Sequence, residues 1–235
     1  MAELKSDSRG VALAGLKEIM ATKGNFVFPV LIPTLLASPM NFFRVKALGS
    51  LIAVAGGQNR RLPMILSEFI KELVLGTEIT AEIYEVIEIL FKTIEGEGIE
   101  IMMELLQDKI LEVRMKQQTV ALRCLALFFG SSNENIEDFV NDWIKVLSAM
   151  LGGPDLSDPA VERATEALAA MDALLKRTRK EDLDKYILAL LYGISQSSYG
   201  LEEESDIIAF TLPNVSFPIS HRDFRLFCLS CCMDC

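Results

Sequence analysis

A repeated unit of about 40 residues constrains this chain more than any other sequence feature. Each unit contains two amphipathic apolar segments, joined by a short turn that is marked by proline, glycine or aspartate. The first segments are residues 11–21, 41–55, 80–94, 113–129 and 160–176, and the second segments are residues 27–36, 62–74, 97–107, 136–151 and 182–196. A period of this length is typical of stacked helix pairs, so the sequence predicts about five such pairs.

The spacing of apolar residues inside the segments predicts α-helices. Leu168, Met171 and Leu175, for example, follow one another at steps of three and four residues. Such steps place the side chains on one face of a helix. A single helical hairpin cannot bury these faces on both of its sides, so neighbouring pairs must stack around a continuous core. We therefore predict an all-α fold, an α-solenoid of about five helix pairs.

The expected domain organisation follows from this repetition. We predict a polar N-terminal tail over residues 1–9, a solenoid over residues 10–200, and an atypical, poorly ordered, cysteine-rich tail over residues 201–235. A solenoid grows by adding repeats, so no internal domain boundary is expected within the middle region.

Charge and hydropathy disfavour binding to nucleic acid and insertion into a membrane. The formal net charge is −10, which disfavours direct binding to nucleic acid, because such binding relies on clustered lysine and arginine. Residues 24–43 carry no charge and are long enough to span a bilayer. Pro29, Pro33 and Pro39 would leave backbone groups unsatisfied in lipid, so we interpret this stretch as a buried helix and a turn. We expect no membrane contact and a cytoplasmic location.

The sequence lacks the usual signatures of an enzyme. It contains one histidine, His221, which lies in the atypical tail, so we expect neither a histidine-based triad nor a multi-histidine metal site. Neither a Gly-rich phosphate loop nor a Gly-x-Ser-x-Gly elbow is present. Glu82, Glu85 and Glu88 form a row that is typical of a solvated helix face. We predict no catalytic residue and no cofactor.

Cysteines gather at the C-terminal end. The last eight residues contain Cys228, Cys231, Cys232 and Cys235. With His221 upstream, this spacing leaves open a metal- or redox-responsive module, although the cluster has no second half-site to enclose an ion. Cys124 lies between apolar residues of a predicted helix and is interpreted as a small buried hydrophobe.

Basic residues collect near the turns of successive repeats. The candidates for partner binding are Arg44, Arg60, Arg61, Arg114 and Lys116. Residues next to turns stack along a solenoid, so these side chains would form a ridge. The alternative is that each is an ordinary solvated helix end.

Six strings carry a resemblance to a known family. They are GLKEIM at 15–20, VFPVLIPTL at 27–35, RVKALGSLIAVAG at 44–56, DWIKVL at 142–147, ALAAMDA at 167–173 and KEDLDKY at 180–186. In their order and spacing the chain resembles the general-control translational activator family over roughly residues 10–213. The resemblance implies a fold of HEAT- or armadillo-like helix pairs.

The resemblance also implies a function. Members of that family are long HEAT-repeat proteins that associate with ribosomes and activate the kinase of translation initiation factor 2 alpha during amino-acid starvation. This stretch is similar to the C-terminal region that binds the RWD domain of the kinase through a basic residue. By position we place that residue at Arg114 or Lys116, in the string EVRMKQ at 112–117. The alternative is a generic HEAT or armadillo adaptor for an unrelated protein partner.

Overall fold

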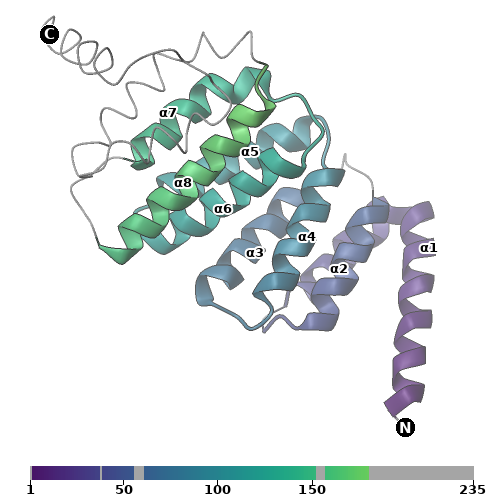
Figure 1. The fold of residues 1–235 in the computed structure, drawn as a ribbon. Coiled ribbons are helices and arrows are strands. Elements are labelled where there is room, and N and C mark those ends of the chain that lie inside the picture. Colours follow the sequence, from purple (N-terminus) through teal and green to yellow (C-terminus); the bar gives the residue numbers. More distant parts are fainter. Residues whose placement is uncertain (1, 38, 56–60, 152–156, 180–235) are drawn as a thin grey trace, which may run out of the picture. The chain divides into compact units, whose positions relative to one another are not determined.

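The computed structural model describes residues 2–37, 39–55, 61–151 and 157–179 (Figure 1). These residues form helices and contain no strand, which confirms the predicted all-α class. The helices are α1 (Ala2–Leu35), α2 (Phe42–Ala55), α3 (Leu62–Leu75), α4 (Thr80–Thr93), α5 (Glu97–Leu111), α6 (Met115–Ser131), the short 3₁₀ helix η1 (Glu137–Phe139), α7 (Val140–Leu151) and α8 (Asp158–Arg177). The chain divides into two compact units, Met1–Asn135 and Ile136–Cys235.

Most predicted segments coincide with a helix, and the differences have local causes. The first two segments both lie in α1, where Lys23 has non-helical backbone angles (φ −134°, ψ 27°) and joins two helices at a kink. Residues 1–9 were predicted as a tail, whereas the backbone of α1 begins at Ala2. The segment 136–151 starts with η1 before α7 continues from Val140. Segment 182–196 and the tail 201–235 lie outside the described residues.

In the unit Met1–Asn135, alternate helices run parallel to one another. α2 packs on α4, and α4 packs on α6. Lys46 of α2 forms an ion pair with Glu85 of α4, and both residues lie in the second turn of their helices. The rings of Phe91 on α4 and Phe128 on α6 meet edge to face, with their centroids 5.3 Å apart. Such stacking of equivalent helices buries a continuous core, as a helical-repeat fold requires.

Gly49 sets how closely α2 and α4 approach. A Cβ atom at this position would lie 2.8 Å from Cγ2 of Val86 and 3.5 Å from Cδ1 of Ile89. The first distance is shorter than van der Waals contact allows, so a larger side chain would push the two helices apart.

The helices α3 and α5 run in the opposite direction to α4 and α6. Short turns connect α3 to α4 and α5 to α6, and each connected pair is in contact, as is usual for antiparallel neighbours. Gly76 ends α3 in the left-handed conformation (φ 77°), and its N–H donates to the carbonyls of Glu72 and Leu73. α3 also contacts α5 and α6.

Backbone contacts join the helices differently from the repeats of the sequence. The pattern pairs α2 with α3 and α4 with α5. The main contacts between consecutive helices of this unit instead join α1 with α2, α3 with α4 and α5 with α6. The helix pairs of the structure are therefore shifted by one helix from the pairs that the sequence predicted. The class of fold is the same.

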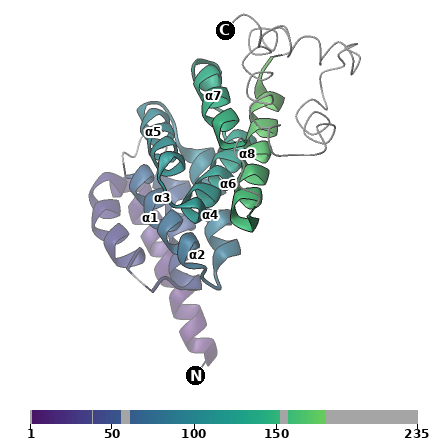
Figure 2. The ribbon, with the colours of Figure 1, turned by 90° about the vertical axis from the view of Figure 1, so that its left-hand side faces the viewer.

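In the second unit, α7 and α8 lie side by side (Figure 1 and Figure 2). Trp143 and Leu147 of α7 are buried, as are Ala167 and Ala170 of α8, whose small side chains permit a close approach. Burial lowers the pKa of the Arg177 guanidinium, at the end of α8, below its ordinary value. Among the helices that the structure describes, none has the length and apolar composition needed to cross a membrane.

Candidate functional site

Arg114 and Lys116 lie where the turn after α5 enters α6. Arg114 precedes the first residue of α6 in an extended conformation, and Lys116 belongs to the first helical turn. Both residues are exposed. Neither side chain forms an ion pair or hydrogen bond with the part of the chain that the structure describes. Two positive charges are therefore presented to solvent at one place.

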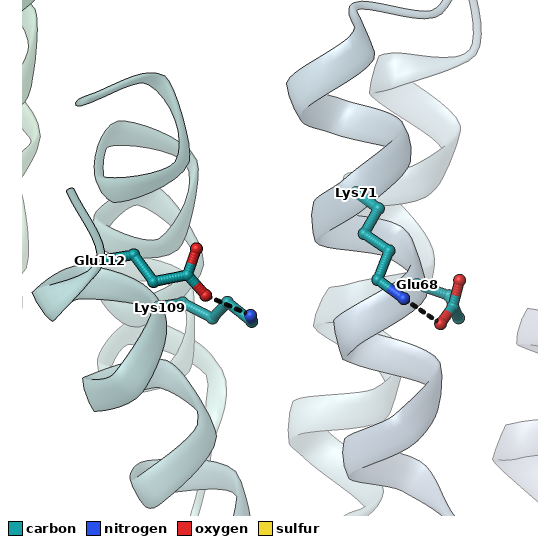
Figure 3. A network of polar contacts seen from close by, with 4 residues as sticks. All are labelled: Glu68, Lys71, Lys109 and Glu112. Atoms are coloured by element: carbon teal, nitrogen blue, oxygen red, sulfur yellow. Dashed lines mark hydrogen bonds and ion pairs between the residues drawn. The ribbon is translucent and has the colours of Figure 1, made fainter. Parts of the chain in front are cut away.

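Hydrogen bonds hold the backbone of this turn. Lys109 Nζ lies 2.5 Å from Glu112 Oε1, as the left half of Figure 3 shows. The side-chain amide of Gln118 donates to the carbonyl of Glu112 at 2.6 Å, and the backbone N–H of Gln118 donates to the carbonyl of Arg114 at 3.1 Å. Because the bonds anchor residues on both sides of Val113, the turn presents Arg114 from a defined position.

Lys116 also reaches the end of a neighbouring helix. Its Nζ lies 3.8 Å from the position of a Cβ atom at Gly76, the residue that ends α3. A cation near the C-terminus of a helix is stabilised by the helix dipole. Lys116 therefore has a structural contribution of its own, in addition to any role in binding.

Arg44 is engaged within the protein. Its guanidinium Nη1 donates to the carbonyl of Ala37 at 2.9 Å, and its backbone N–H donates to Oδ1 of Asn41 at 3.1 Å. The two bonds fasten the turn that leads into α2. Lys46, two residues later, is held by Glu85 and lies 5.8 Å from the centroid of the Phe42 ring.

The predicted ridge is distributed over two edges of this unit. Arg44 and Arg114 lie at the starts of parallel helices and share an edge, but α4 lies between these helices, with Glu78 in the turn before it and Glu82 in its first turn. Arg61 precedes α3, at the end of that helix opposite to Gly76, and the 14 residues of α3 span about 20 Å. Arg60 lies outside the described residues.

Sequence reasoning missed exposed apolar residues around the same turn. Leu75 ends α3, Leu111 ends α5, and Val113 lies in the turn itself, although the apolar pattern had assigned Val113 to a helix. The signal that could have found them is their position at or beyond the last turn of a helix. A residue at such a position does not lie on the helix face that packs against the core.

Two members of the acidic row on α4, Glu85 and Glu88, are paired with lysines. Glu85 binds Lys46 of α2, and Glu88 Oε1 lies 2.6 Å from Lys92 Nζ. Within the described ranges, no group of three or more histidine, cysteine, aspartate or glutamate residues is placed to hold a metal ion. Cys124 is fully buried, as predicted. The cluster Cys228–Cys235 and His221 lie outside the described residues.

Parallel stacking of alternate helices, with charged residues displayed at the turns, defines this protein as a helical-repeat scaffold. Residues 27–214 match the model of the family described as "Stalled ribosome sensor GCN1-like, HEAT repeats". The match covers most of the sequence, and the chain belongs to this family of HEAT-repeat proteins.

Relatives of this chain come from three organisms. The chain is 28% identical over 214 residues to the eIF-2-alpha kinase activator GCN1 of Saccharomyces cerevisiae, with 88% of the chain and 8% of the relative covered. It is 29% identical over 213 residues to the protein of the same name from Dictyostelium discoideum, again covering 88% and 8%. Protein ILITYHIA of Arabidopsis thaliana is 29% identical over 186 residues, covering 78% and 7%. The chain therefore spans less than a tenth of the length of these relatives.

Proposed function

We propose that this chain is a non-catalytic docking segment that binds the RWD domain of a kinase of translation initiation factor 2 alpha. The observation that carries the proposal is the exposed pair Arg114 and Lys116 on a turn held by hydrogen bonds. Two relatives are named activators of an eIF-2-alpha kinase, which supports the choice of partner.

The mechanism in this proposal is recruitment. Stacked helix pairs hold spaced contacts in a stable arrangement. Binding to such a surface raises the local concentration of the kinase near its activating signal, and the scaffold performs no chemistry itself. Ribosome association, a response to amino-acid starvation and a cytoplasmic location belong to the same proposal, as properties of the longer proteins that contain this segment.

Electrostatics supports an acidic contact surface on the partner. The chain as a whole carries a net charge of −10, so most of its surface repels acidic proteins. Arg114 and Lys116 form a local exception, and neither is neutralised by a described carboxylate. A guanidinium also binds a carboxylate through two hydrogen bonds, which fixes orientation as well as affinity.

The test is calorimetric binding of the isolated RWD domain to the wild-type chain and to R114E/K116E. We expect the variant to bind at least about tenfold more weakly, because each reversal turns attraction into repulsion. A matched control is K71E/K145E, which introduces the same change in charge at two exposed lysines. The right half of Figure 3 shows Lys71 next to Glu68 of its own helix.

Circular dichroism separates lost binding from lost structure, because both variants should keep the helical content of the wild type. Equal binding by R114E/K116E and the wild type would contradict the assignment of these residues. If the folded wild-type chain does not bind the RWD domain, the kinase is not its partner. A generic HEAT adaptor for another protein would then describe the chain better.

A further inference from the structure

Three apolar side chains are exposed around the turn that carries Arg114. Val113 is 96% exposed, Leu75 is 74% exposed and Leu111 is 58% exposed. The core does not require them, because Leu73 and Ile110 already fill the buried positions at the ends of α3 and α5.

These apolar residues belong to one patch with the two basic residues. Leu75 is bonded to Gly76, whose Cβ position would lie 3.8 Å from the ammonium of Lys116. Leu111 and Val113 flank Glu112, and Val113 is bonded to Arg114. α3 is in contact with both α5 and α6, which brings the end of α3 to this turn. We call this surface the turn patch: Leu75, Leu111, Val113, Arg114 and Lys116.

The chemistry of the turn patch restricts what it can bind. Its apolar members favour a partner with exposed aliphatic or aromatic side chains, since burial of such surface drives association. Arg114 and Lys116 require carboxylates beside those side chains, because a buried cation without a counter-charge opposes binding. Glu112 does not supply that carboxylate, because it is paired with Lys109.

The turn patch is ordered before a partner binds. The turn is held by Gln118 and by the Lys109–Glu112 ion pair, so Val113 and Arg114 are displayed before any partner arrives. A surface that is already ordered loses less conformational entropy on association.

We propose that the turn patch docks a segment of a partner protein in which an apolar side chain lies next to an acidic one. This inference rests on the proposed function, because it assigns that segment to the surface of the RWD domain. Arg114 and Lys116 bind the carboxylate, and Leu75 and Val113 cover the adjacent apolar side chain. Affinity therefore has an apolar part that the charge-reversal experiment leaves unmeasured.

The experiment compares RWD binding by L75S/V113S with binding by the wild type. We expect affinity to fall about tenfold, because two apolar side chains lose their contact area. A matched control is M64S/V161S, which changes two exposed apolar residues outside the turn patch and should bind like the wild type. Val113 lies outside any helix, so V113S alone provides a variant that leaves helix packing untouched.

Salt separates the two parts of the affinity. Raising the ionic strength from about 0.05 M to about 0.5 M should shrink the difference between the wild type and R114E/K116E, because exposed charges are screened. The effect of L75S/V113S should persist over the same range, because apolar contact is not screened.

Each outcome decides between the two proposals. If R114E/K116E loses binding but L75S/V113S binds like the wild type, the inference is wrong and the proposed function stands. If the wild type does not bind the RWD domain, both fail. If light scattering detects a wild-type dimer that L75S/V113S abolishes, the turn patch joins two copies of this chain and the inference is overturned.

Discussion

The starts of α2 and α6 have the same local sequence pattern, but their basic side chains make different contacts. Arg44 and Lys46 begin α2 with the order Arg-x-Lys, and Arg114 and Lys116 repeat it at α6. In α2 both basic side chains are engaged internally, by the carbonyl of Ala37 and by Glu85 of α4. In α6 neither side chain forms an ion pair or hydrogen bond with the described residues.

The comparison shows that a basic pair next to a turn is not by itself a binding site. Whether it is available depends on what the neighbouring elements supply. α4 presents Glu85 to Lys46, whereas Lys116 lies near Gly76 at the end of α3 and forms no ion pair with the described residues. Stability should therefore depend more on the pair at α2 than on Arg114, and binding should depend on the pair at α6.

The largest expected effect on stability comes from breaking the packing that brings α4 to α2. G49A places a Cβ atom 2.8 Å from Val86, and overpacking of this kind costs about 1–3 kcal/mol of unfolding free energy. Chemical denaturation monitored by circular dichroism measures the loss. The double variant G49A/V86A relieves the clash and should lose less stability than the sum of the single variants. Additive losses would show that the contact does not limit the approach.

Removing one arginine from each pair tests the comparison directly. R44A should lower the unfolding free energy by about 1 kcal/mol, because the carbonyl of Ala37 loses a charge-assisted hydrogen bond. R114A should change it by less than about 0.5 kcal/mol, as is usual for an exposed residue without such a partner. Denaturation curves of the two variants, recorded side by side, check this expectation. Equal losses would remove the distinction between the two pairs.

The smallest effect is expected at the ion pair between α2 and α4. Lys46 and Glu85 are substantially exposed, so their coupling should be about 0.2–1 kcal/mol. A double-mutant cycle with K46A and E85A measures the coupling free energy, and added salt should reduce it. A coupling that salt leaves unchanged would indicate that packing of the lysine stem, and not its charge, joins the helices.

Much of the fold could be predicted from local pattern. The segments 41–55, 62–74 and 80–94 coincide with α2, α3 and α4 to within a residue or two, because apolar steps of three and four report helix directly. The kink at Lys23 falls in the predicted break between segments 11–21 and 27–36, but the sequence did not predict that helical backbone continues on both sides of it as α1. The positions of Arg114 and Lys116 were predicted, but their availability to a partner was not.

The sequence by itself determined the all-α class, the helix positions and the repeat, since each depends on residues a few positions apart. Only the tertiary structure decided which helices meet, and with them which side chains remain available. Lys46 finds its carboxylate 39 residues away, and Lys116 lies against the end of α3. Such distances along the chain carry no periodic signal, because they follow from how whole helices dock. The sequence therefore located the basic pairs, and helix packing distinguished a structural pair from an available one.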